Sequence, residues 1–133
     1  MGAFAVILLD TCALLWWTLE PSMLSNAAKK ACNRIVDTGA VVSTISVWEI
    51  GIKLKKGTLR MPETLHGYVN RLRLMESLEI LAINETIWVE CVDLDWDHKD
   101  PADRTIVATA RLRNLPIVTK DPRIASYYGR IIW

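Results

Sequence analysis

The apolar positions along the chain follow two alternating patterns. Short continuous runs of aliphatic and β-branched residues, each of strand length, occur at residues 4–9, 40–44, 78–83, 115–118 and 131–133. Between them, apolar residues spaced near 3.6 predict helices at residues 24–36, 47–56, 65–74, 87–94 and 106–112. Strands that are apolar throughout and alternate with helices are typical of a mainly parallel sheet covered on both faces. We therefore predict an α/β fold, a three-layer α/β/α sandwich.

Glycine and proline mark the ends of some of these predicted helices. Gly39 and Gly57 are placed to close the helices that precede them. Pro62 is placed to open the helix that runs toward Met75.

Length and composition limit the kind of protein. A chain of 133 residues, 51% hydrophobic and 23% charged, suits one folded core, and we expect a single domain over residues 1–133. The longest apolar runs are far shorter than the ~20 residues that cross a bilayer, and the first run has no basic leader. The three cysteines show no zinc-ligand spacing. We expect a cytoplasmic protein that does not enter a membrane.

Acidic side chains recur where predicted strands end and helices begin. Asp10 ends the first strand, and Glu49 lies shortly after the second. Asp103 lies at the start of a helix, and Asp121 follows the fourth strand. In a parallel α/β sheet the strand-to-helix loops all emerge at the carboxyl edge, where open sheets place their sites. We therefore expect these four side chains to meet, although they are far apart in the sequence.

Helix capping is the alternative explanation for each acid. Aspartate is a favoured N-cap, and Glu49 lies three residues after Ser46, as in a capping box. Asp100 and Asp121 each precede a proline, as N-caps often do. Taken alone, each acid is better explained as a cap. Capping does not, however, require acids at several successive strand ends.

Converging carboxylates repel one another unless a cation balances their charge. Their oxygens are hard ligands, which suit Mg²⁺ or Mn²⁺. Such an ion can bind a scissile phosphate and lower the pKa of an attacking water, so phosphodiester hydrolysis is the predicted chemistry. Thr11 and Thr119 each neighbour one of the acids, either to orient a ligand or as ordinary strand-end threonines.

The basic residues give a weaker indication of a nucleic-acid partner. A net charge of +1 is too small to indicate such binding by itself, so any basic surface has to be local. Lys53, Arg104 and Lys120 are the candidate RNA contacts, with simple solvated surface charge as the alternative. His98, in the loop before Asp100, is placed to approach a phosphate, but we interpret it as an uninvolved loop histidine. No glycine-rich nucleotide loop or serine-nucleophile elbow occurs in the sequence.

Four segments in order carry a family resemblance. They are LLDT at residues 8–11, SVWEI at 46–50, HKDPADR at 98–104 and PIVTKD at 116–121. Together they resemble PIN-domain proteins, specifically the VapC toxins of prokaryotic type II toxin–antitoxin systems, over essentially the whole chain. The resemblance implies a doubly wound PIN fold, Mg²⁺- or Mn²⁺-dependent endoribonuclease activity, frequent homodimerisation, and inhibition by a cognate VapB-type antitoxin.

The resemblance also implies roles for individual residues. Asp10, Glu49, Asp103 and Asp121 match the acidic quartet of the family. Asp10 and Asp103 are then the firmest metal ligands, with Glu49 binding directly or through water and Asp121 through water. Asp100 is a neighbouring acid that we expect to act as a cap rather than a ligand. RNA, toxicity and the antitoxin rest on the resemblance alone.

Two positions depart from the pattern of the family. Cys12 stands where many relatives have a histidine, and Ala102 stands where many have an aromatic residue. Neither change removes an acid, so activity is still expected, but the packing near the site and the shape of the substrate pocket are left open. Two competing hypotheses stay open: a PIN nuclease of RNA processing or decay, and a PIN-like binding module that has lost catalysis.

Overall fold

Five short apolar strands form the sheet at the centre of the protein. They are β1 (Ile7–Leu9), β2 (Ala40–Ser43), β3 (Leu78–Leu81), β4 (Ile117–Val118) and β5 (Ile131–Ile132). The computed structural model, which describes residues 6–133, orders them β3-β2-β1-β4-β5, with every neighbouring pair parallel. The chain builds the sheet outward from β1 in one direction and from β4 in the other. The switch point, where such folds bind ligands, therefore lies between β1 and β4.

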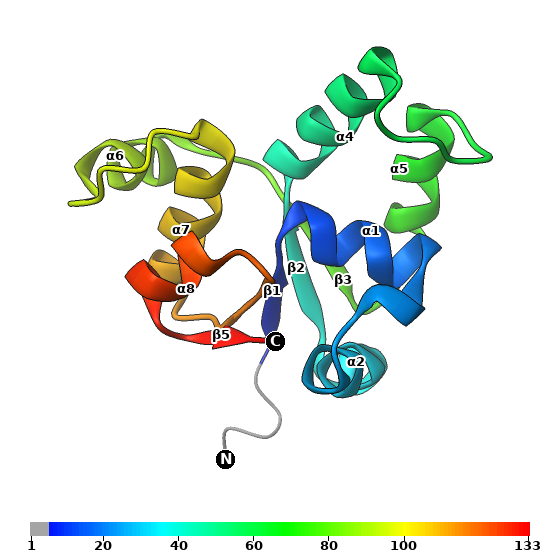
Figure 1. Ribbon diagram of the computed structural model, residues 1–133, viewed down its shortest axis with the longest axis horizontal. Coiled ribbons are helices and arrows are strands. Elements are labelled where there is room, and N and C mark those ends of the chain that lie inside the picture. Colours follow the sequence, from blue (N-terminus) through cyan, green and yellow to red (C-terminus); the bar gives the residue numbers. More distant parts are fainter. Residues whose placement is uncertain (1–5) are drawn as a thin grey trace.

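Helices cover both faces of the sheet (Figure 1). One face carries α1 (Thr11–Leu19), the short 3-10 helix η2 (Pro21–Met23), α2 (Asn26–Asn33), α3 (Ile35–Thr38), α4 (Thr44–Lys56) and α5 (Leu65–Arg73). The other face carries α6 (Glu85–Asp93), α7 (Pro101–Arg113) and α8 (Pro122–Tyr128). The predicted three-layer α/β/α sandwich is confirmed.

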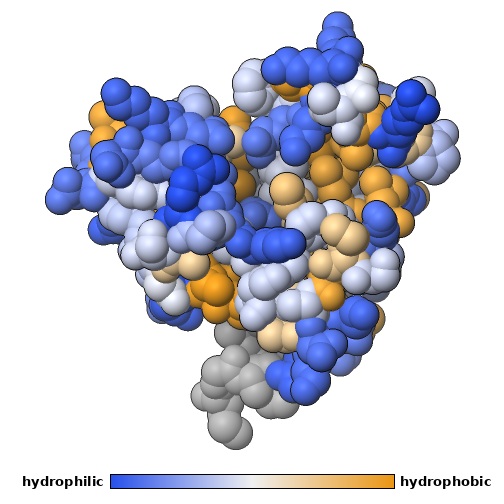
Figure 2. Space-filling model, in the orientation of Figure 1, coloured by the Kyte–Doolittle hydropathy of each residue, from blue (hydrophilic) through white to orange (hydrophobic). Residues whose placement is uncertain are grey.

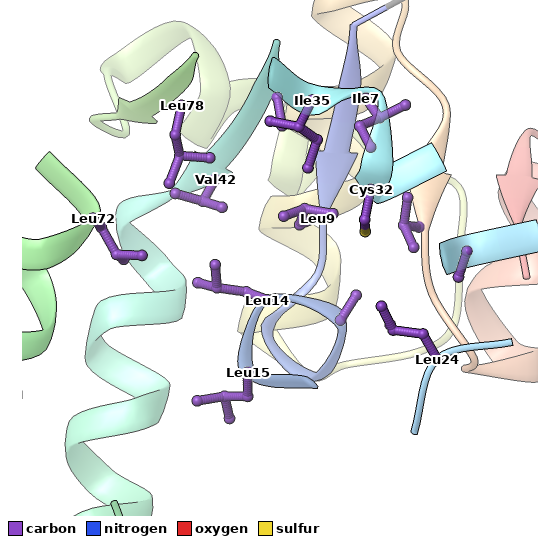
Figure 3. Close-up of a cluster of buried hydrophobic side chains, with 14 of the residues drawn as sticks. Ile7, Leu9, Leu14, Leu15, Leu24, Cys32, Ile35, Val42, Leu72 and Leu78 are labelled. Atoms are coloured by element: carbon purple, nitrogen blue, oxygen red, sulfur yellow. The ribbon is translucent and has the colours of Figure 1, made fainter. Parts of the chain in front are cut away.

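Consecutive strand residues point to opposite faces of the sheet, and helices bury both faces of the central strands. Leu9 and Val42 belong to the core under α1 and α5, where Figure 3 shows them with Leu14 and Leu72. Leu8 belongs to the core on the opposite face. This two-sided burial explains why the strands appear in the sequence as uninterrupted apolar runs.

Two helices were not predicted, α1 and α8. Each begins directly after an aspartate that caps it, Asp10 for α1 and Asp121 for α8. Most of α1 is apolar and its first half is buried, so it lacks the alternation of apolar and polar faces that indicates a surface helix. The seven-residue α8 is too short to show a clear period.

Other boundaries also differ from the predictions. The helix expected at residues 24–36 is divided into α2 and α3. Pro62 does not open α5, which is capped instead by Thr64, whose hydroxyl accepts a hydrogen bond from the amide of Gly67. The predicted closures at Gly39 and Gly57 are confirmed, with φ of 87° and 74°. The first residues of the strand expected at 4–9 lie outside the described part.

Within residues 6–133, the helices are all too short or too polar to cross a membrane.

Candidate active site

Four carboxylates line one cavity of about 350 Å³ at the carboxyl edge of the sheet. Asp10 follows β1 and Glu49 lies on α4, while Asp103 lies in the first turn of α7 and Asp121 caps α8. The structure therefore brings together the four acids that the sequence singles out, beside the switch point between β1 and β4. Capping and convergence are not exclusive, because two of the four are caps as well.

Asp10 is the most deeply buried of these acids, with 7% of its surface exposed. The amide of Ala13 donates to its Oδ1 at 2.8 Å, and the hydroxyl of Thr119 donates to its Oδ2 at 2.5 Å. Burial raises the pKa of Asp10 to about 6, although these two hydrogen bonds act in the opposite direction. Thr119 also accepts a hydrogen bond from the amide of Asp121 at 3.0 Å, so one hydroxyl connects two of the acids.

Glu49 is held by a hydroxyl from the neighbouring helix. Oγ1 of Thr11 donates to Oε1 of Glu49. Oγ1 of Thr11 also lies 2.8 Å from the hydroxyl oxygen of Ser46. Burial raises the pKa of Glu49. The predicted capping box is wrong, since Ser43 caps α4 by accepting from the amide of Ile45. Ser46 and Glu49 lie inside the helix, one turn apart, and both face Thr11.

Asp103 has a histidine partner. Its Oδ2 lies 2.7 Å from Nε2 of His98, and burial raises the pKa of Asp103. The interpretation of His98 as an uninvolved residue is wrong. Asp100 caps α7 by accepting from the amide of Ala102. Single ligand atoms of His98, Asp100 and Asp103 lie within 4.8 Å of one another.

Asp121 caps α8 and lies beside Arg123, a basic residue that the sequence did not place next to the acids. The amide of Arg123 donates to Asp121 Oδ1 at 2.9 Å. The guanidinium of Arg123 lies 3.4 Å from Asp121 Oδ2 and 4.0 Å from Asp103 Oδ2. Its position two residues after Asp121, in the first turn of a capped helix, is the sequence signal that indicates this proximity.

The predicted basic residues divide into two groups. Lys53 and Lys120 line the cavity, and Lys120 Nζ lies 6.0 Å from the ring centre of Trp16. Arg104 instead donates to main-chain carbonyls between residues 91 and 98, including that of Trp96 at 2.6 Å. Because its N–H groups are engaged within the protein, we correct the expectation that Arg104 contacts RNA.

Cys12 and Ala102, the two departures from the family pattern, lie near the acids in the structure. Cys12 lines the cavity, and burial together with the neighbouring Asp10 raises the pKa of its thiol. Cys12 is thereby kept as a neutral thiol, which is a poor metal ligand. Ala102 is buried at the start of α7.

The donors around the cavity fit a hard divalent cation. Apart from the Cys12 thiol they are oxygen atoms, from the four carboxylates and from the hydroxyl of Thr11. Burial and mutual repulsion make Asp10, Glu49 and Asp103 costly to ionise, and a bound cation offsets both effects. Mg²⁺ and Mn²⁺ prefer such oxygen ligands.

Comparisons with known proteins agree with this description. The model of the family described as PIN domain matches residues 7–130. Ribonuclease VapC22 of Mycobacterium tuberculosis (strain ATCC 25618 / H37Rv) is 30% identical over 122 residues, which cover 91% of each chain.

Two solved structures are similar in fold. A toxin–antitoxin complex from Klebsiella pneumoniae has a TM-score of 0.65 at 21% identity, covering 96% of each chain. FitAcB from Neisseria gonorrhoeae has a TM-score of 0.66 at 20% identity, covering 94% of this chain and 95% of its own. The family model spans nearly the whole described chain, and the arrangement of sheet and helices agrees with it. The chain belongs to the PIN-domain family.

Proposed function

We propose that this protein is a metal-dependent endoribonuclease and the toxin component of a VapBC-type toxin–antitoxin system. The observation that carries the proposal is the convergence of Asp10, Glu49, Asp103 and Asp121 on one cavity. The similarity to a VapC ribonuclease over most of the chain supports RNA as the substrate.

We give each acid the role that the resemblance to the family implies. Asp10 and Asp103 would hold Mg²⁺ or Mn²⁺, Glu49 would bind it directly or through a water, and Asp121 would act through a water. Thr119 and Thr11 keep the carboxylates of Asp10 and Glu49 in place through their hydrogen bonds. A bound ion would lower the pKa of the attacking water and balance the negative charge of the scissile phosphate.

The lysines at the cavity provide the contacts to RNA. Lys53 and Lys120 are the two basic residues in its lining, and the other charged lining residues are the four acids. We assign them to the phosphates on either side of the scissile bond, because phosphate contacts fix the register of a nucleic acid without reading its sequence.

The expected protein partners are a VapB-type antitoxin and a second copy of this chain. Solved structures of similar fold include a toxin–antitoxin complex. An apolar groove lies between α4 and α5, and Figure 2 shows hydrophobic surface in this region. Trp48 on α4 lines this groove and is 61% exposed. We place the protein in the cytoplasm, with its RNA substrate.

Cleavage of a mixed pool of tRNA, rRNA and mRNA tests the proposal. The purified, antitoxin-free protein is incubated with Mg²⁺ or Mn²⁺, beside samples with EDTA and with the variant Asp10→Asn. Asp95→Asn, which makes the same change at an exposed residue, is the matched control. We expect discrete fragments that require both the metal and Asp10 but not Asp95. A folded wild-type protein that yields no fragments would refute nuclease activity and favour a binding module.

A further inference from the structure

The hydrogen bond between His98 and Asp103 uses one of the two carboxylate oxygens of a proposed metal ligand. An ionised carboxylate can only accept, so Nε2–H of His98 is the donor to Oδ2 of Asp103, and the two side chains are only 13% and 16% exposed. Oδ1 of Asp103 receives no hydrogen bond from the described residues. Every buried polar side-chain atom in the described part of the chain has a hydrogen-bond partner. Because Oδ1 has none, it is exposed to solvent. The histidine fixes one oxygen of the carboxylate and leaves the other free to bind a cation.

The loop that carries His98 is fixed by the residue next to Asp103. Residues 94–100 form no helix or strand. Arg104 holds this loop by donating to the carbonyl of Leu94 at 2.9 Å, that of Trp96 at 2.6 Å and that of His98 at 3.0 Å. Arg104 and Asp103 lie in the same turn of α7, so the helix that carries the ligand also fixes the loop that orients it.

Aromatic packing fixes the ring of His98 from a second direction. The ring of Trp96 meets that of His98 edge-on, with centroids 4.8 Å apart and planes at 61°. Trp96 also stacks on Tyr127 of α8, with centroids 4.7 Å apart and planes at 6°. The imidazole is thus held by its backbone, by an aromatic neighbour and by the carboxylate itself.

We propose that His98 is a positioning residue that presents Oδ1 of Asp103 to the divalent cation, with Arg104 and Trp96 holding the histidine in place. This inference rests on the metal site of the proposed function. Partners of metal-ligating groups in proteins orient those groups, and losing such a partner typically weakens metal binding about 10- to 100-fold. His98 acts through Asp103, because its Nε2–H is used by the carboxylate and because Asp103, but not His98, lines the cavity.

Mn²⁺ titration in the absence of RNA, followed by calorimetry, tests the proposal. We compare the wild-type chain with His98→Ala, which removes the donor, and with His98→Gln, whose amide nitrogen can reach a similar position. His66→Ala is the matched control, since His66 is exposed on α5. The melting temperature in EDTA is measured for each variant, which separates loss of fold from loss of orientation.

We expect His98→Ala to weaken Mn²⁺ binding at least about tenfold with little change in melting temperature, and His98→Gln to recover most of the affinity. His66→Ala should bind Mn²⁺ like the wild type. Unchanged affinity in His98→Ala would overturn the inference. So would a loss that follows a fall in melting temperature and that glutamine does not reverse, which indicates a merely structural role.

The titration also separates this inference from the proposed nuclease activity. A wild-type protein that binds Mn²⁺ through His98-dependent positioning but cleaves no RNA would support the inference and refute the nuclease. A wild-type protein that binds no Mn²⁺ would overturn the inference together with the metal site.

Discussion

Asp10→Asn removes the charge of the most buried carboxylate while keeping its shape. The pKa of Asp10 rises from 3.8 to about 6 in the folded protein, mainly because burial disfavours the charged form. Each unit of pKa difference corresponds to about 1.4 kcal/mol, so ionised Asp10 destabilises the metal-free fold by at most about 3 kcal/mol. Asparagine can still accept from the amide of Ala13. Asparagine fits the hydroxyl of Thr119 less well than aspartate does, which offsets part of this gain. We therefore expect the free energy of unfolding to rise by about 1–2 kcal/mol.

The sign of the pH dependence follows from the direction of the pKa change. The folded-state pKa lies above the unfolded one, so the contribution of Asp10 to stability is complete below about pH 4 and is lost as the pH rises through about 6. The stabilisation of Asp10→Asn over the wild type should therefore be full at about pH 7.5 and small at about pH 4.

Urea denaturation in EDTA at these two pH values measures the effect. Asp95→Asn, at an exposed position, is the control and should change the free energy of unfolding little at either pH. A variant Asp10→Asn that is less stable than the wild type at the higher pH would refute the reasoning. A stability difference that does not depend on pH would refute it equally.

Four further outcomes are expected. Mn²⁺ at a hundred times its dissociation constant should stabilise the wild type by about 2.7 kcal/mol, measured by thermal unfolding, and Asp10→Asn by much less; equal gains would place the ion elsewhere. Arg104→Ala should lower the free energy of unfolding by about 3 kcal/mol, because several carbonyls lose their donor, and a change under 1 kcal/mol in urea would contradict this. Thr119→Val should weaken Mn²⁺ binding about tenfold in calorimetry, since Asp10 loses its hydroxyl partner, and unchanged affinity would deny that role. Lys120→Ala, introduced into the inactive Asp10→Asn protein, should reduce the salt dependence of RNA binding by about 0.7 in log–log slope, and an unchanged slope would exclude a phosphate contact.

The sheet and the convergence of the acids could be predicted because both depend on regular geometry. Strands buried on both faces appear as continuous apolar runs, as at Leu8 and Leu9. Parallel strands place their carboxyl ends at one edge, so Asp10 and Asp121 had to approach one another. The sequence alone therefore supports a prediction of the fold and of the cavity to which the four acids contribute.

The partners of the acids could not be predicted in the same way. His98 contacts Asp103 through the path of an irregular loop, and no periodic pattern describes such a path. Arg104 carries the charge expected of an RNA contact, but that loop offers it main-chain carbonyls that lie outside any helix or strand. Helix α1 was not predicted because most of its residues are apolar, so its sequence does not show the alternation of apolar and polar faces that indicates a helix.

The central claim is that the cavity bounded by the four acids binds the divalent ion. Anomalous diffraction from crystals grown with Mn²⁺, collected at the manganese absorption edge, tests it most directly. The account predicts an anomalous peak in contact with the carboxylates of Asp10 and Asp103, absent from crystals of Asp10→Asn. A fully formed cavity without a peak, in crystals that contain Mn²⁺ at saturating concentration, would contradict it.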